Sequence, residues 1–147
     1  MLYTSKDVYA RVVYAMVEAY QVKPVTNTVM CLMKGVDSQI LHNHGFLEKS
    51  LKEALARDHF TILGNVSYDF EPHGFSDVEL LKESHASIHT YPEFSGLQVI
   101  LNTCRGRNDG RRVLELFRDM IKPKAFTVCE LEADFTFLKF TYQGSWL

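Results

Sequence analysis

The sequence has little cysteine and no long apolar run. Its three cysteines, Cys31, Cys104 and Cys129, are odd in number and far apart, which argues against a disulfide framework and favours free thiols in a reducing compartment. No apolar stretch reaches the roughly 18 residues that a membrane-spanning helix needs. Residues 1–7 lack the basic and then apolar order of a signal peptide. We therefore expect a cytoplasmic protein with no membrane partner.

The sequence also lacks an excess of charge of either sign. Its formal net charge is -2, which gives no electrostatic reason to expect a nucleic-acid partner. The one dense basic cluster comprises Arg105, Arg107, Arg111 and Arg112. The hydrophobic share of 46% over 147 residues is enough for a core without disulfides or metals. We expect a single domain spanning residues 1–147.

The spacing of apolar residues predicts helices and strands in a mixed order. Helices are expected at residues 5–20, at about 43–57 with Asn43 as its cap, and before Pro123 with Asn108 or Asp109 as its cap. The first of these forms an N-terminal extension, residues 1–24. Strands are expected at residues 25–33, 60–70, 78–90, 97–103, 125–131 and 135–142. Clustered strands with few helices predict an α+β two-layer sandwich, in which helices cover one face of a mainly antiparallel sheet.

One predicted strand holds an unusual number of reactive groups. The stretch LKESHASIHTYPE, residues 81–93, contains two acids, two serines and two histidines. One interpretation is a half-buried strand with a polar outer face. The strand predicted at residues 78–90 has alternating apolar residues, which are Val78, Leu80, Ala86 and Ile88.

Two chemical interpretations of this stretch lack support. His85 and His89 are four residues apart and Cys104 is a conceivable third metal ligand, but no CxxC or HExxH pattern accompanies them. We therefore expect no metal. Ser84 lies outside any GxSxG nucleophile motif, which argues against a hydrolase.

The same stretch resembles a known family. Residues 83–93, ESHASIHTYPE, closely resemble the self-cleavage motif of the S-adenosylmethionine decarboxylase family in its short bacterial and archaeal form. Residues 70–76, FEPHGFS, resemble the family pattern F-x-P-x-G-x-S. The pair Thr103–Cys104 stands where the family has a Thr-Cys pair, twenty residues after Ser84 (104 − 84).

The resemblance implies a proenzyme that cleaves itself and makes its own cofactor. The Ser84 hydroxyl attacks the carbonyl of Glu83, and the ester that results breaks by β-elimination. Position 84 then becomes a pyruvoyl group, a ketone that forms a Schiff base with the substrate amine and accepts electrons during decarboxylation. Cys104 matches the proton donor, and His89 and Ser76 match the residues that assist cleavage, the serine by a hydrogen bond to the Glu83 carbonyl.

This mechanism places a demand on the backbone. Ser84 and His89 differ by five positions, so an unbroken strand directs them to opposite faces. We therefore expect a bend or bulge at the cleavage point.

The resemblance also implies a small-molecule substrate and a homodimer whose sites draw residues from both subunits. Phe70 and Tyr91 match rings that hold adenine, and Glu93 matches an acid that binds ribose. The chain departs from the family at Ile100, Asn102 and Arg105, where the family has aspartate, phenylalanine and glycine. Arg105 is expected either to lower the pKa of Cys104 or to bind the substrate carboxylate.

These departures leave the substrate open. S-adenosylmethionine is favoured, because Phe70, Tyr91 and Glu93 all persist. Ornithine or arginine is the alternative, with the distal charge met by Glu93, Glu71 or Asp69. A homologue that does not cleave itself and regulates a partner is a further alternative.

Overall fold

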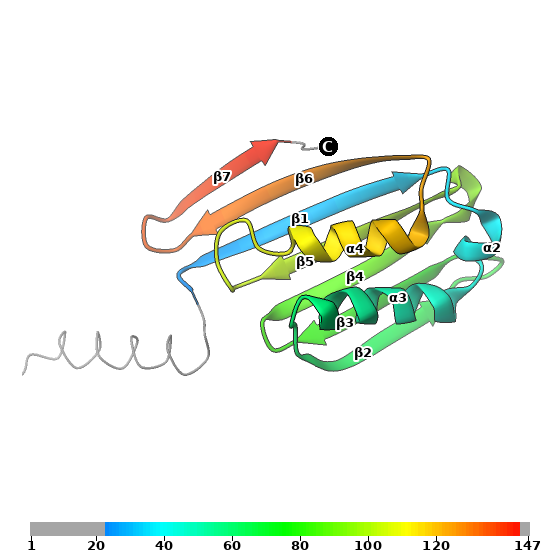
Figure 1. Cartoon of the computed structure of the whole chain (residues 1–147), viewed down its shortest axis with the longest axis horizontal. Coiled ribbons are helices and arrows are strands. Elements are labelled where there is room, and N and C mark those ends of the chain that lie inside the picture. Colours follow the sequence, from blue (N-terminus) through cyan, green and yellow to red (C-terminus); the bar gives the residue numbers. More distant parts are fainter. Residues whose placement is uncertain (1–22, 145–147) are drawn as a thin grey trace, which may run out of the picture.

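The computed structural model describes residues 23–144, which form one antiparallel sheet with helices against one face (Figure 1). The strand order is β2-β3-β4-β5-β1-β6-β7. The strands are β1 (Val25–Lys34), β2 (Ile62–Asp69), β3 (Phe75–Leu81), β4 (Ser84–Tyr91), β5 (Gly96–Thr103), β6 (Ala125–Asp134) and β7 (Lys139–Gly144). The predicted α+β two-layer sandwich is confirmed. The helix predicted at residues 5–20 lies outside the described residues.

Helices α2 (Ser38–Leu41), α3 (His44–Arg57) and α4 (Arg111–Ile121) form the second layer. The Asn43 side chain caps α3, as predicted, by accepting a hydrogen bond of 3.0 Å from the N–H of Phe46. The predicted cap of α4 is wrong. Gly110 occupies that position, because the carboxylate of Asp109 is bound instead to Arg105 and Thr103.

The core lies between the sheet and the two long helices. Leu51 of α3 and Phe117 of α4 are fully buried against Leu101 and Val29 of the central strands. Gly110 lets α4 approach this closely: its φ is +91°, and a Cβ there would lie 2.8 Å from Leu101 Cδ2. The start of α4, and with it the loop after β5, is thereby fixed against the sheet.

The single strand predicted at residues 78–90 is wrong. The chain reverses at residues 82–83, and β3 and β4 pair as a hairpin. The reversal changes which residues face the helices: Ala86 and Ile88 are buried as expected, but Val78 and Leu80 are exposed. The buried positions of β3 are instead Phe75, Asp77, Glu79 and Leu81.

The opposite face of the sheet, which we call the open face, carries no helix within residues 23–144. Paired residues of neighbouring strands share a face, so the register assigns side chains to it. It bears many exposed apolar side chains. Those on β2, β3, β4 and β1 are Val66, Tyr68, Val78, Leu80, Tyr91 and Leu32.

Candidate active site

The Glu83–Ser84 bond lies at the end of the β3–β4 hairpin. Ser84 pairs with Leu81 of β3 and Thr103 of β5. Its φ is +147°, a region that residues other than glycine seldom adopt. The bend predicted at the cleavage point is therefore present, as a complete reversal of the chain.

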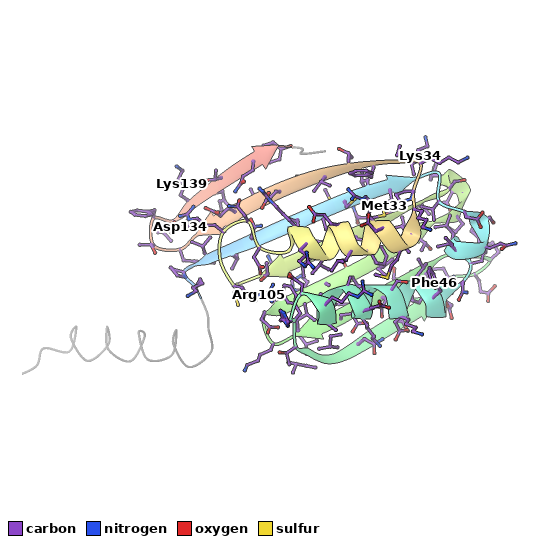
Figure 2. The ribbon with its side chains drawn as sticks, in the orientation of Figure 1. Met33, Lys34, Phe46, Arg105, Asp134 and Lys139 are labelled. Atoms are coloured by element: carbon purple, nitrogen blue, oxygen red, sulfur yellow. The ribbon has the colours of Figure 1, made fainter. Side chains whose placement is uncertain are left out.

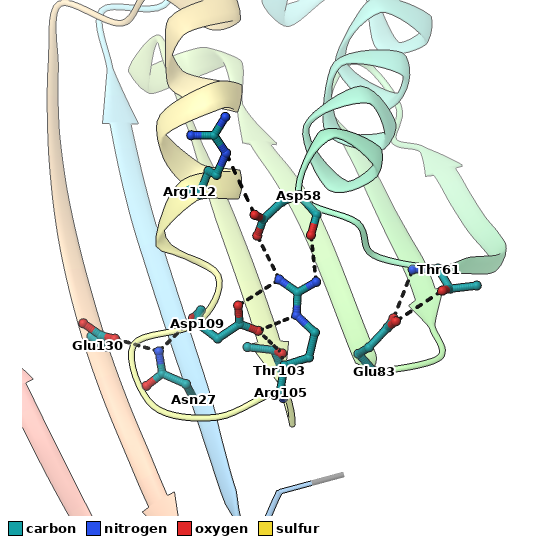
Figure 3. A network of polar contacts seen from close by, with 9 residues as sticks. All are labelled: Asn27, Asp58, Thr61, Glu83, Thr103, Arg105, Asp109, Arg112 and Glu130. Atoms are coloured by element: carbon teal, nitrogen blue, oxygen red, sulfur yellow. Dashed lines mark hydrogen bonds and ion pairs between the residues drawn. The ribbon is translucent and has the colours of Figure 1, made fainter. Parts of the chain in front are cut away.

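The backbone carbonyl and the side-chain carboxylate of Glu83 both accept hydrogen bonds. Its backbone carbonyl accepts a hydrogen bond of 3.0 Å from the N–H of Cys104. Its carboxylate accepts hydrogen bonds of 3.1 Å from the N–H of Thr61 and 3.2 Å from the Thr61 hydroxyl (Figure 3). Thr61 in turn accepts a hydrogen bond from the N–H of Lys82 through its carbonyl. The carbonyl expected to be attacked is thus polarised by an N–H and fixed in place.

The Ser84 hydroxyl also has defined neighbours. It donates a hydrogen bond of 2.7 Å to Asn102 Oδ1 and lies 3.1 Å from His85 Nδ1. The Asn102 amide donates a 2.6 Å hydrogen bond to the Thr28 hydroxyl, which directs its Oδ1 toward Ser84. The sequence singled out Asn102 only as a departure from the family, and His85 only as a conceivable metal ligand. Their approach to Ser84 depends on its unusual backbone, which no local pattern reveals.

The environment of Cys104 keeps its thiol protonated. Burial raises the pKa of Cys104, and the carboxylates of Glu83 and Asp109 raise it further. Arg105 lowers this pKa, but not enough to reverse the effect. The expected lowering by Arg105 is therefore confirmed in direction, but burial, followed by the two carboxylates, outweighs it and the net pKa of Cys104 is raised.

Arg105 is also engaged elsewhere. Its guanidinium donates hydrogen bonds to both carboxylate oxygens of Asp109, and to the carbonyl and Oδ2 of Asp58, at 2.7–2.9 Å (Figure 3). It also lies 3.6 Å above the Phe60 ring centroid. Arg105 therefore joins the end of α3 to the loop before α4, with its guanidinium engaged by Asp58 and Asp109.

The rest of the dense basic cluster is likewise paired with acids. Arg107 forms ion pairs with Glu132 and Asp134, and Arg111 forms one with Glu130. The cluster fastens the loop before α4 to β6. The fourth member, Arg112, is more exposed, and its Nε lies 4.0 Å from Asp58 Oδ1.

A second group of predicted site residues lies near the other end of β4. The Ser76 hydroxyl contacts His89 Nδ1. The His89 ring lies 5.6 Å from that of Phe70 and 4.7 Å from that of Tyr91, between centroids. Glu93 Oε2 lies 3.8 Å from His73 Nε2.

A cavity adjoins the second group. Its volume is about 520 Å³, and its lining includes Tyr91, Phe94, Leu32 and Lys34. Figure 2 shows Lys34 at one end of β1 and Arg105 toward the other. The cavity beside the second group lies at the Lys34 end, and Cys104, which precedes Arg105, lies at the opposite end.

The first group of site residues comprises Glu83, Ser84 and Cys104, and it lies far from the second group within one protomer. Ser84 and His89 are five positions apart, which is about 16 Å along β4. The structure therefore does not bring Ser76 to the Glu83 carbonyl, where Cys104 is the donor instead. A further cavity of about 360 Å³ lies beside Asn102 and Thr28, between them and residues 131–140. The first group thus has space next to it for a small molecule or for a partner's side chains.

Comparison with known proteins identifies the family. Residues 27–134 match the family model described as S-adenosylmethionine decarboxylase. The S-adenosylmethionine decarboxylase proenzyme of Picrophilus torridus is 29% identical over 98 residues, which cover 67% of this chain and 75% of that protein. The proenzyme of Archaeoglobus fulgidus is 26% identical over 98 residues, 67% of this chain and 88% of that protein.

Solved structures agree with these relatives. The adenosylmethionine decarboxylase of Aquifex aeolicus superposes with a TM-score of 0.66 at 26% identity, covering 72% of this chain and 88% of that chain. A Trypanosoma brucei AdoMetDC monomer shares the fold, with a TM-score of 0.51 at 13% identity over 71% of this chain and 45% of that one. The family match includes every residue of both groups. The chain therefore belongs to the S-adenosylmethionine decarboxylase family.

Proposed function

We propose that this protein is a self-processing decarboxylase of S-adenosylmethionine that cleaves its own chain between Glu83 and Ser84. The observation that carries the proposal is the geometry of that bond. It lies at a hairpin end, its carbonyl accepts a hydrogen bond from the N–H of Cys104, and Ser84 has a φ of +147°. A strained junction with a polarised carbonyl next to a hydroxyl is what an acyl shift requires.

Ser84 and the residues around it fit a pyruvoyl group derived from Ser84. The side chain is a hydroxyl, and it reaches the open face, where it contacts Asn102. A pyruvoyl group supplies a ketone that binds the substrate amine and accepts the electrons left when the carboxylate departs as carbon dioxide. Within residues 23–144 the side chains that contact the Ser84 hydroxyl are those of Asn102 and His85, which form hydrogen bonds, so a ketone is compatible with the site.

Cys104 is suited to donate the proton that replaces the lost carboxylate. Its N–H contacts the Glu83 carbonyl, so the residue lies directly beside the reacting position. Because burial raises the pKa of its thiol, Cys104 carries its proton at neutral pH.

The second group supports an adenosyl substrate. The rings of Phe70 and Tyr91 both lie against the His89 ring, and Glu93 follows Tyr91 by two residues. Flat apolar faces favour stacking of a purine base, and they also attract a sulfonium cation. Asp69, one of three acids considered for a basic amino acid, contacts His44 on the helix-covered side, away from these rings.

The separation of the two groups supports a homodimer with composite sites. Each protomer would supply Ser84, Glu83 and Cys104 to one site, and Ser76, His89, Phe70, Tyr91 and Glu93 to the other. The open face, with its exposed apolar side chains, offers the surface for such a sheet-to-sheet contact. An antiparallel arrangement of two copies would bring opposite ends of β4 together.

Intact mass and carbon dioxide release test the proposal. We expect two chains, residues 1–83 and 84–147, the second beginning with a pyruvoyl group. We expect carbon dioxide from carboxyl-labelled S-adenosylmethionine, and none from labelled ornithine or arginine. Ser84→Ala is the matched control and should stay one chain of 16.9 kDa without activity. A wild-type chain that remains uncut would refute self-processing, and release from ornithine or arginine alone would refute the substrate.

A further inference from the structure

We propose that His85 is the general base of self-cleavage, so that its Nδ1 takes the proton of the Ser84 hydroxyl as that oxygen attacks the Glu83 carbonyl. This inference rests on the proposed processing at Glu83–Ser84. His85 lies within the motif that resembles the family, but the resemblance assigns it no function. It is identified by its contact with the reacting oxygen, Nδ1 to Oγ 3.1 Å.

The contact between these two consecutive residues is unusual. In a regular strand, neighbouring side chains point to opposite faces and do not meet. Ser84 meets His85 because its φ of +147° turns the Ser84 side chain toward the open face. The register assigns His85 to that face, opposite Leu80 and Asn102. The strained backbone therefore brings a hydroxyl and an imidazole together at the bond expected to break.

Two acceptors surround the Ser84 hydroxyl, and only one of them can remove its proton. Asn102 Oδ1 accepts the hydroxyl hydrogen at 2.7 Å, and its orientation is fixed by the bond from its Nδ2 to Thr28. An amide oxygen orients a hydroxyl but does not hold a proton near neutral pH, whereas imidazole does. Asn102 thus positions the oxygen, and a rotation of the O–H bond transfers its hydrogen bond to His85.

The Glu83 carbonyl, which is the electrophile, is polarised and held by hydrogen bonds from other residues. The Cys104 N–H already donates to the Glu83 carbonyl oxygen at 3.0 Å and can stabilise the negative charge that develops there. Thr61 holds the Glu83 carboxylate through two hydrogen bonds. The carbonyl is thereby held while the attacking oxygen is oriented.

The proposed step conserves atoms and charge. The Ser84 Oγ–H proton moves to His85 Nδ1, and an Oγ–C bond forms to the Glu83 carbonyl carbon. The carbonyl electron pair moves to its oxygen and returns as the C–N bond to Ser84 breaks. The imidazolium gives its proton to the departing amine. An ester and a free amine at position 84 result, and neutral His85 is regenerated.

The surroundings leave the imidazole free to act. Its strand partners, Leu80 of β3 and Asn102 of β5, carry no charge. Residues 23–144 contain no ion pair to His85, and the titratable groups around the junction are Lys82, Glu83 and Cys104. His85 is exposed, so small molecules in solution can reach its position.

Cleavage of newly made full-length chain provides the test. Wild type, His85→Gln, His85→Ala and the control His42→Gln, a change at another exposed histidine, are synthesised in a cell-free system. The uncut fraction is followed by mass between pH 5 and 9. We expect His85→Gln to cut roughly 100-fold more slowly, and we expect acid to slow cleavage of wild type but not of His85→Gln, because a protonated base cannot accept the hydroxyl proton. Added imidazole should accelerate His85→Ala and leave His85→Gln unchanged.

The outcomes separate this inference from the proposed function. If wild type and His42→Gln cut themselves while His85→Gln is slow and imidazole restores His85→Ala, the base is His85. If wild type and His85→Gln cut at equal rates, or the slow His85→Ala gains nothing from imidazole and keeps the wild-type pH profile, His85 is not the base although processing stands. If wild type does not cut at all, both proposals fail.

Discussion

At the scale of single residues, the site combines groups that a motif reveals with groups that only folding assembles. The roles of Ser84 and Cys104 were implied by the family resemblance, which rests on a local motif and a fixed spacing, and the pairing of Thr103 with Ser84 in the ladder explains that spacing. Thr61 and Asp58 come from distant segments and carry no motif. Arg105 was expected either to lower the pKa of Cys104 or to bind the substrate carboxylate, because the sequence shows its charge but not that Asp58 and Asp109 fold against it.

Replacing Arg105 should destabilise the protein. Arg105→Met leaves the partly buried carboxylate of Asp109 without its cation and that of Asp58 with only Arg112, 4.0 Å away, at an expected cost of about 2–3 kcal/mol in the free energy of unfolding. Burial raises the pKa of Asp109, but hydrogen bonds from Arg105 and Thr103 outweigh it and hold the pKa below its usual value. The stability from this group is therefore present above the unfolded pKa and is lost as pH falls through the folded one.

Urea unfolding at pH 7 and pH 3, in the uncut Ser84→Ala background, measures both effects. The control is Arg57→Met, because Arg57 and Glu53 form an exposed ion pair on α3 that should contribute under about 0.5 kcal/mol. Equal losses in the two variants, or a loss at Arg105 that is no smaller at pH 3, would contradict the prediction.

At the scale of elements, the acidic residues that β3 buries explain why the alternation of apolar residues predicted the wrong buried face for this strand. A strand that buries Asp77 and Glu79 shows its apolar residues on the outer positions, so the pattern of Val78 and Leu80 indicates the wrong face. Sequence periodicity assumes that buried means apolar. It located β1, α3 and α4 well, because their buried sides are mainly apolar, with Asn27 and Ser50 as exceptions.

Glu79 should give the packing of α3 on β3 a pH dependence. Burial, followed by the neighbouring Asp77 carboxylate, raises the pKa of Glu79 to about 7, and Lys52 at 3.6 Å only partly offsets this. Glu48 adds to the negative field from α3. A folded pKa above the unfolded value of 4.5 means that this contribution to stability is complete below about pH 4.5 and is lost as pH rises through about 7.

Glu79→Gln should therefore stabilise the Ser84→Ala chain at pH 8, by about 1–3 kcal/mol, and by much less at pH 5. Chemical denaturation at both values measures the difference. Glu53→Gln, an exposed change on α3, should leave the curves unchanged. A constant offset between Glu79→Gln and its parent at the two pH values would show that ionisation of Glu79 is not the cause.

At the scale of the whole molecule, the distance between the two groups predicts complementation between subunits. Cys104→Ala and His89→Ala chains should each be inactive alone. If sites are composite, co-expression yields mixed dimers with one intact site, and pools of equal amounts should regain about a quarter of wild-type decarboxylation. Differently tagged chains allow the mixed dimer to be isolated and assayed. Activity no higher in the mixed dimer than in either parent would place each site within one chain.

The predicted cut would also interleave its products. Residues before Ser84 build β1, β2, β3 and both α2 and α3, whereas those after Glu83 build β4 to β7 and α4. Yet β1 lies between β5 and β6, and β3 pairs with β4. The two polypeptides therefore pair with each other at three places inside one sheet, namely β3 with β4, β1 with β5, and β1 with β6. Neither could leave without unfolding the other, so the enzyme would have to complete its fold as one chain before becoming two.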